Sequence, residues 1–82
     1  MAAFNGACEI RGAGLNSQDG LVHFDLKSKD GTFDWTPFTA PPEHGREMLA
    51  IALAAVTTGK NVVVQAADTA AWAPVWWFDI TK

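Results

Sequence analysis

The chain is poor in cysteine and in basic residues. Cys8 is its only cysteine, so a disulfide within the chain is excluded and stability must come from packing or partner chains. Lysine and arginine number 6 against 9 aspartates and glutamates, for a formal net charge of −3. Because no overall positive field attracts phosphate backbones or anionic lipid, nucleic acid is a disfavoured partner.

Long hydrophobic runs are also lacking. The longest, Met48 to Val56, is far shorter than the roughly 20 residues that span a bilayer, which excludes a membrane span. No basic segment followed by an apolar one opens the chain, so we expect no signal peptide in it. The sequence does not determine the cellular compartment of the protein, and secretion is expected only if the family resemblance described below holds.

What the chain does have is apolar material. At 82 residues it predicts a single domain over residues 1–82 with a thin core. Hydrophobic residues make up 49%, including four tryptophans and five phenylalanines, more than one thin core readily hides. Assembly with further copies of the chain is the usual remedy in small domains.

Apolar and polar residues alternate over the first half of the chain. Residues 4–15 predict a strand with glycine bends, 16–20 a turn, and 21–27 a half-buried strand. Asp30-Gly31 is a typical two-residue hairpin signal, so 32–38 is predicted to be the returning strand.

The second half predicts a helix and two strands. Pro42 opens a helix over about 42–58 that Gly59 caps, residues 61–65 form a buried strand, 66–74 a loop, and 75–81 the last strand. Three strands, a helix and two strands is the order of an OB-fold, a five-stranded barrel with its helix between strands three and four. The alternative is an open antiparallel sheet with the helix packed on one face.

The helix has nearly two and a half turns without a polar residue. We expect Leu49, Leu53 and Val56 to face the core, while Ile51, Ala54 and Ala55 face elsewhere. Either this second face is bland alanine surface or it packs on the helices of neighbouring chains. The predicted oligomer interface comprises Met48, Ile51, Ala54, Ala55 and Trp77.

Four tryptophans are candidates for ligand stacking. Trp35 and one of Trp76 and Trp77 are expected in the core, because adjacent strand residues point to opposite faces. Trp72, in a loop without apolar periodicity, is the best ligand-facing candidate. In an OB-fold the ligand surface is the face of strands two and three with the loops after strands one and four. Mapped here, the predicted ligand-binding residues are Asn16, Ser17, Asp19, Asp68, Thr69 and Trp72, with His23, Asp25, Thr32 and Asp34 on the same surface.

Few residues suggest catalysis or metal binding. His23, His44 and Cys8 do not form a metal-ligand spacing, and Cys8, in phase with Ile10, is predicted to be a buried core residue. The carboxylates are scattered and no glycine-rich phosphate loop precedes a helix. We therefore expect neither an enzyme nor a metal or cofactor.

Two segments carry a resemblance to a known family. Gly59-Lys60-Asn61-Val62-Val63-Val64 and Pro74-Val75-Trp76-Trp77-Phe78-Asp79-Ile80 resemble small secreted bacterial proteins related to the pentameric binding subunits of AB-type toxins, notably the subtilase-cytotoxin kind. The resemblance covers about residues 44–80 and implies an OB-fold, a ring of subunits and secretion. Those proteins commonly have a second cysteine before the last strand, and Cys8 has no such partner here.

Three functions remain open. The first is a homo-oligomeric, ring-forming and pentameric binding module for glycans, because hydroxyl, amide and carboxylate groups beside a tryptophan suit neutral sugars. The second is a self-assembling structural ring that docks on another polypeptide, such as a catalytic partner. The third is a single-stranded nucleic acid binding OB-fold.

Overall fold

A long, bent first strand organises the barrel. The structure is a computed structural model that describes residues 3–16, 18 and 20–80. Strand β1 (Phe4–Asn16) pairs with β4 (Val62–Ala66) through its first residues and with β2 (Leu21–Ser28) through the rest. Cys8 pairs with both neighbours, opposite Val62 and Ser28. The pairing shifts between Ile10 and Gly12, which confirms the predicted glycine bend.

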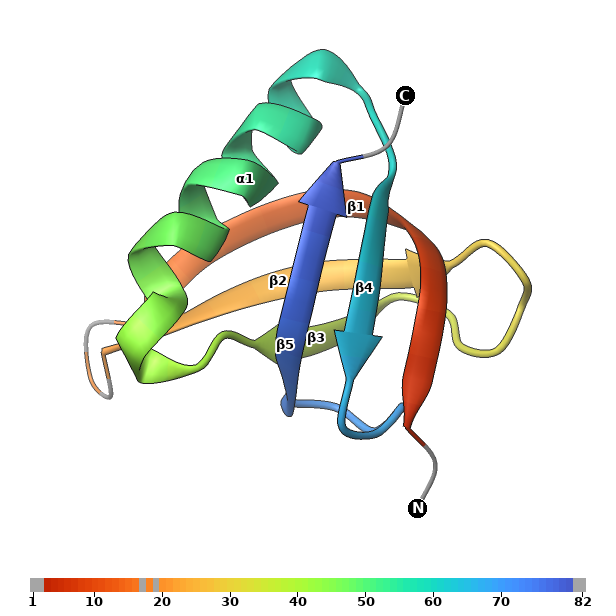
Figure 1. The fold of residues 1–82 in the computed structure, drawn as a ribbon, viewed down its shortest axis with the longest axis horizontal. Coiled ribbons are helices and arrows are strands. Elements are labelled where there is room, and N and C mark those ends of the chain that lie inside the picture. The colour runs from red at the N-terminus through yellow and green to blue at the C-terminus, as the bar shows by residue number, and fades with distance from the viewer. Residues whose placement is uncertain (1–2, 17, 19, 81–82) are drawn as a thin grey trace.

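The sheet closes on itself. Its strand order is β1-β2-β3-β5-β4, and β4 returns to β1. Strand β3 (Thr36–Thr39) pairs antiparallel with β2 and parallel with β5 (Ala73–Ile80) (Figure 1). This is a closed OB-like barrel with its helix between β3 and β4, as the element order predicted, and closure rules out the open-sheet alternative.

The second strand follows its predicted alternation. Every second residue of β2 is buried, beginning with Val22, Phe24 and Leu26. The core gathers inside the barrel around aromatic rings: Phe24 lies 4.7 Å from Phe78, centroid to centroid, and Phe33 lies 5.1 Å from Phe38. The largest fully buried side chains are Phe24, Phe38, Leu26, Val62, Val64, Val75 and Cys8.

The two-residue hairpin predicted at Asp30-Gly31 is wrong. Leu26 pairs with Thr36, so β3 begins four residues later than predicted and residues 29–35 form a loop. The Ser28 side chain holds the loop closed, because its hydroxyl donates to the Phe33 carbonyl and accepts from the Phe33 amide.

Local hydrogen bonds shape the tip of that loop. Asp30 accepts hydrogen bonds from the Thr32 amide and hydroxyl, an Asx-type turn that the sequence signal did not distinguish from a hairpin turn. Thr32 and Asp34 therefore lie in the loop and not on a strand face.

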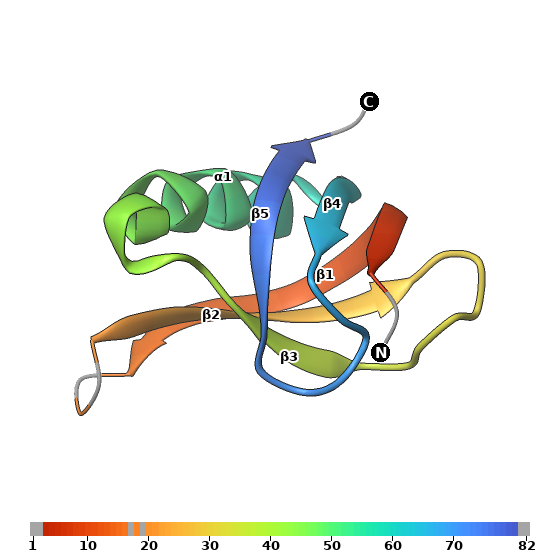
Figure 2. The ribbon, with the colours of Figure 1, turned by 60° about the horizontal axis from the view of Figure 1, so that its bottom comes forward.

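The helical segment between β3 and β4 covers one end of the barrel (Figure 2). The 3-10 turn η1 (Pro42–His44) leads into α1 (Gly45–Thr58), which together match the predicted span. Gly59 ends α1 at φ 70°, a left-handed cap, and its amide donates to helix carbonyls as predicted. Among the described residues, neither α1 nor η1 has the length and apolar character needed to cross a membrane.

The core-facing side of α1 differs from the prediction. Met48, Ala52 and Ala55 are buried, whereas Leu53 and Val56 are exposed at 48% and 37%. Because alanine side chains are short, Ala52 and Ala55 fit against the barrel beside Met48, and Leu53 and Val56 lie on the flank. Of the predicted interface residues, Met48 and Ala55 therefore belong to the chain's own core and Ile51 packs partly against it, while Ala54 and Trp77 are exposed.

A bulge in the last strand overturns the expectation for Trp76 and Trp77. Gln65 pairs with Trp77 and Ala66 with Val75, so Trp76 is an extra residue in the ladder. The burial pattern shifts there, and both tryptophans face outward, 52% and 51% exposed, between buried Val75 and Phe78. The prediction that one of them packs in the core is wrong.

Candidate functional site

The candidate site lies on the outer face of β1, β2 and β3. His23 on β2 sits between Gly14 of β1 and Thr39 of β3, and Asp25 sits between Gly12 and Pro37. Since residues directly opposite in paired strands point to the same side, these positions share one outer surface. It is the face that OB-folds commonly use for ligands.

Trp72 lies beside this surface and contacts it through β3 and His23. It lies in the loop between β4 and β5, 60% exposed, as predicted. Its backbone is fixed to β3 on both sides: the Trp72 amide donates to the Pro37 carbonyl at 2.6 Å and its carbonyl accepts from Thr39 Oγ1 at 3.3 Å. These contacts hold the residue at φ 68°, a left-handed conformation that non-glycine residues seldom adopt. Such held strain is often found at ligand sites.

His23 supports the Trp72 ring. The two rings meet edge to face, with centroids 6.3 Å apart and an interplanar angle of 76°. The imidazole lies over Gly14, where a Cβ atom would come within 3.1 Å of His23 Nε2. The glycine thus leaves room for His23 to lie against β1, and Trp72 and His23 form one platform. We call these two residues the Trp72 platform.

A second polar group lies farther along the same face. Arg11 is the extra residue of the β1 bulge, and its Nε donates to Asp25 Oδ2 in a partly exposed ion pair. The Arg11 guanidinium also lies 4.4 Å from the centroid of the Trp35 ring, a cation–π contact. Trp35 is therefore half-buried beneath Arg11 in the 29–35 loop, and the expectation that it packs in the core is wrong.

The structure places the other predicted ligand residues unevenly. Asp68 and Thr69 are half-buried in the same loop as Trp72, where Asp68 Oδ1 accepts from the Thr69 amide at 2.7 Å. Asn16 is the last residue of β1, paired with Leu21. Ser17 and Asp19 lie outside the described residues.

Sequence reasoning missed Arg11, Gly14 and Trp35 as site residues. Gly12 was predicted to bend the strand, and a bulge beside it re-aims the neighbouring side chain, which is the signal that points to Arg11. No neighbouring residue in the sequence indicates a role for Gly14, because the His23 ring that lies against it comes from β2.

The one cysteine lies away from this face, in the core. Its burial, as predicted, is complete, and this burial, with a smaller contribution from the Asp30 charge, raises the pKa of the Cys8 thiol to about 12. Hydrogen bonds from Thr32 hold the pKa of Asp30 below its usual range. Within the described residues, no three His, Cys, Asp or Glu side chains gather in a way that would hold a metal ion.

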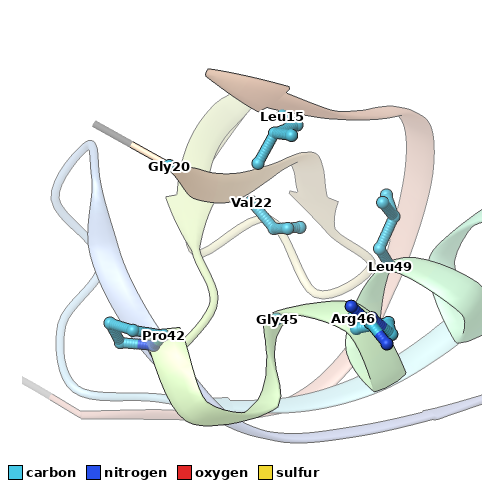
Figure 3. Close-up of a pocket in the computed structure, with 7 residues that line it drawn as sticks. All are labelled: Leu15, Gly20, Val22, Pro42, Gly45, Arg46 and Leu49. Carbon is cyan, nitrogen blue, oxygen red and sulfur yellow. The ribbon is translucent and has the colours of Figure 1, made fainter. Parts of the chain in front are cut away.

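A cleft of about 310 Å³ opens on the other side of β2 (Figure 3). Its lining comes from the ends of β1 and β2 and from the start of the helical segment: Leu15, Gly20, Val22, Pro42, Gly45, Arg46 and Leu49. Val22 points inward and His23 outward, so this cleft and the Trp72 platform lie on opposite sides of the strand.

Comparison with known proteins gives no relative. No family model, no curated protein and no solved structure matches the chain. The fold class therefore rests on the barrel itself, and the resemblance to toxin binding subunits stays a prediction.

Proposed function

We propose that this chain is a non-enzymatic, homo-oligomeric binding module for glycans, and that Trp72 stacks on a sugar ring. The observation that carries the proposal is the geometry of Trp72. An apolar ring is 60% exposed on the OB-fold ligand face, at a strained φ of 68°, fixed by two backbone contacts to β3. A structural tryptophan would be expected to bury its ring instead.

The surroundings of the ring suit sugar chemistry. A sugar has an apolar face of C–H groups, which an indole ring can cover, and hydroxyl groups around its edge, which need donors and acceptors. His23 touches the Trp72 ring, and Asp68 and Thr69 share its loop. Arg11 already pairs with Asp25, and the chain's net charge is −3, so this surface favours a neutral ligand over a phosphate backbone.

A self-assembling interaction protein is the second candidate. It is favoured by the exposed apolar side chains away from the Trp72 platform, namely Leu53, Val56, Trp76, Trp77 and Ile80. In that function the assembled chain docks on another polypeptide, and Trp72 binds no sugar. Single-stranded nucleic acid binding is the third, supported by the OB-like fold and by Arg11 and Trp35 on the same face.

A glycan array of the purified chain separates these functions. The proposal predicts that a defined set of neutral glycans is bound and that Trp72→Ala lowers the affinity at least tenfold, about 1.4 kcal/mol. Absence of any bound glycan would remove the first function. Tight oligonucleotide binding at low salt that weakens steeply as salt rises would establish the third in its place.

A further inference from the structure

The outer surface of β5 is as aromatic as the Trp72 platform but differently built. The bulge between Gln65 and Ala66 turns two neighbouring tryptophans, Trp76 and Trp77, to the outside of the barrel, each about half exposed. Figure 1 shows β5 along the front of the barrel, beside β4. We call Trp76, Trp77 and Gln65 the β5 patch.

The polar atom of Trp76 already has a partner. Trp76 Nε1 donates to Gln65 Oε1 at 3.0 Å, on the neighbouring strand. What Trp76 presents outward is then its apolar ring, which requires surface cover and no hydrogen-bond acceptor from a partner. Gln65 Oε1 is already engaged by this bond, so the two indole rings make up most of what the patch presents, and an apolar surface fits them well.

The exposed area is large for so few residues. A fully buried tryptophan removes about 250 Å² from water at most, so two rings about half exposed offer roughly 250 Å² together. A stable interface takes about 800 Å² from each partner, of which about 60% is apolar, or roughly 480 Å². The two tryptophans alone supply about half of that apolar area.

From this area we propose that the β5 patch is covered by the β5 patch of a second copy of the chain. The proposal rests on the homo-oligomeric state of the proposed function and moves the main contact from the helix to β5. The same patch on both copies gives a self-complementary contact with four tryptophans at its centre. Met48 and Ala55 cannot contribute, because the chain's own core buries them.

Sedimentation velocity over a concentration series tests the contact. We expect the wild-type chain to sediment above the monomer mass. The double variant Trp76→Ser/Trp77→Ser should remain folded by circular dichroism and associate roughly thirtyfold more weakly or worse, the usual effect of truncating an aromatic hot spot. The matched control is Trp72→Ser, which removes a similarly exposed tryptophan from outside the β5 patch and should associate as the wild type does.

Three results would overturn the proposal. A wild-type chain that stays monomeric at its highest soluble concentration has no such contact. A double variant that associates normally places the contact elsewhere. A monomeric wild type that binds lipid vesicles or glycans only with Trp76 and Trp77 present assigns the patch to a different partner.

The glycan array keeps this inference separate from the proposed function. If the double variant is monomeric but the wild type binds no glycan, the β5 contact stands and the glycan function fails. If glycans bind through Trp72 and the double variant still assembles, the glycan function stands and the β5 contact fails.

Discussion

Trp72 and Trp77 are exposed to similar degrees, 60% and 51%, yet the chain places them by different means. Trp72 sits in a loop at a strained φ, and two backbone contacts to β3 fix it beside His23. Trp77 lies on strand β5, opposite Gln65, next to a bulge at which the ladder gains one residue, so that both Trp76 and Trp77 face outward. The loop arrangement fixes a single ring among polar groups, whereas the strand arrangement exposes two adjacent apolar rings over a wider area. Exposure alone therefore does not distinguish a ligand platform from an assembly surface.

The two surfaces share one core contact, which gives the largest expected effect. Phe24 follows His23 on β2 and is buried, and its ring centroid is 4.7 Å from that of Phe78, next to Trp77 on β5. Phe78→Ala should lower the free energy of unfolding by about 3–5 kcal/mol and weaken glycan binding and self-association together. The measurement is urea unfolding followed by tryptophan fluorescence. Trp77→Ala is the control, and an equal loss of stability from it would show that the burial pattern of β5 is misassigned.

The helix provides the next contrast. Ile51 packs partly against the core and Ala54 is exposed. Ile51→Glu should lower the free energy of unfolding by about 2–3 kcal/mol, because a charge would lose part of its hydration without a partner. Ala54→Glu should change it by less than about 0.5 kcal/mol. Thermal unfolding of the two variants measures both changes in stability. If Ala54→Glu stays stably folded but no longer assembles, the helix and not β5 forms the subunit contact.

Much of the fold was predictable because it depends on local pattern. The alternation of buried and partly exposed residues in β2 and the Gly59 cap of the helix both follow from residues that are close together in the sequence. The misjudged features depend on contacts that the pattern does not encode. The Ser28 hydroxyl bonds to Phe33 and closes a loop where a hairpin was expected, and the register with β4 decides where Trp76 points.

For the helix and for the candidate site, too, the sequence pattern predicts the element but not its tertiary contacts. Leu49, Leu53 and Val56 form the more hydrophobic stripe, yet Leu53 and Val56 are exposed, Leu49 packs only partly against the core, and the buried residues are Met48, Ala52 and Ala55. For the site, the exposed loop position of Trp72 was predicted, whereas its contact with His23 depends on how β2 and β3 pair and was not predictable from either segment alone.

Cys8 joins the two halves of β1, and its thiol makes that junction sensitive to high pH. The folded state raises the thiol pKa from 9.0 to about 12, so between these values the unfolded chain ionises while the folded chain does not. The free energy of unfolding should fall by about 1.4 kcal/mol for each pH unit above 9 because of this group. Unfolding curves from pH 8 to 11 test it, with Cys8→Ala as the reference. At pH 7 that variant should cost roughly 1 kcal/mol. Parallel pH profiles for the two chains would contradict the burial of the thiol.

Gly14 gives the smallest and most local effect. An added Cβ would come within 3.1 Å of His23 Nε2, whereas at Gly12 it would meet nothing within 4 Å. Gly14→Ala should therefore tilt His23 and Trp72 and weaken glycan binding about two- to fivefold, under roughly 1 kcal/mol. Gly12→Ala should leave binding unchanged, and neither substitution should affect assembly. Calorimetric titration compares them, and equal affinities would mean that His23 does not position Trp72.

The Trp72→Gly variant tests the central claim most directly, because glycine suits the left-handed φ of 68° that the wild-type residue holds. Titration of this variant with a glycan that the wild-type chain binds should show at least a tenfold loss of affinity, while its free energy of unfolding stays within about 1 kcal/mol of the wild type or rises. Unchanged affinity in a stably folded Trp72→Gly chain would contradict the account, because the Trp72 ring would then take no part in glycan binding.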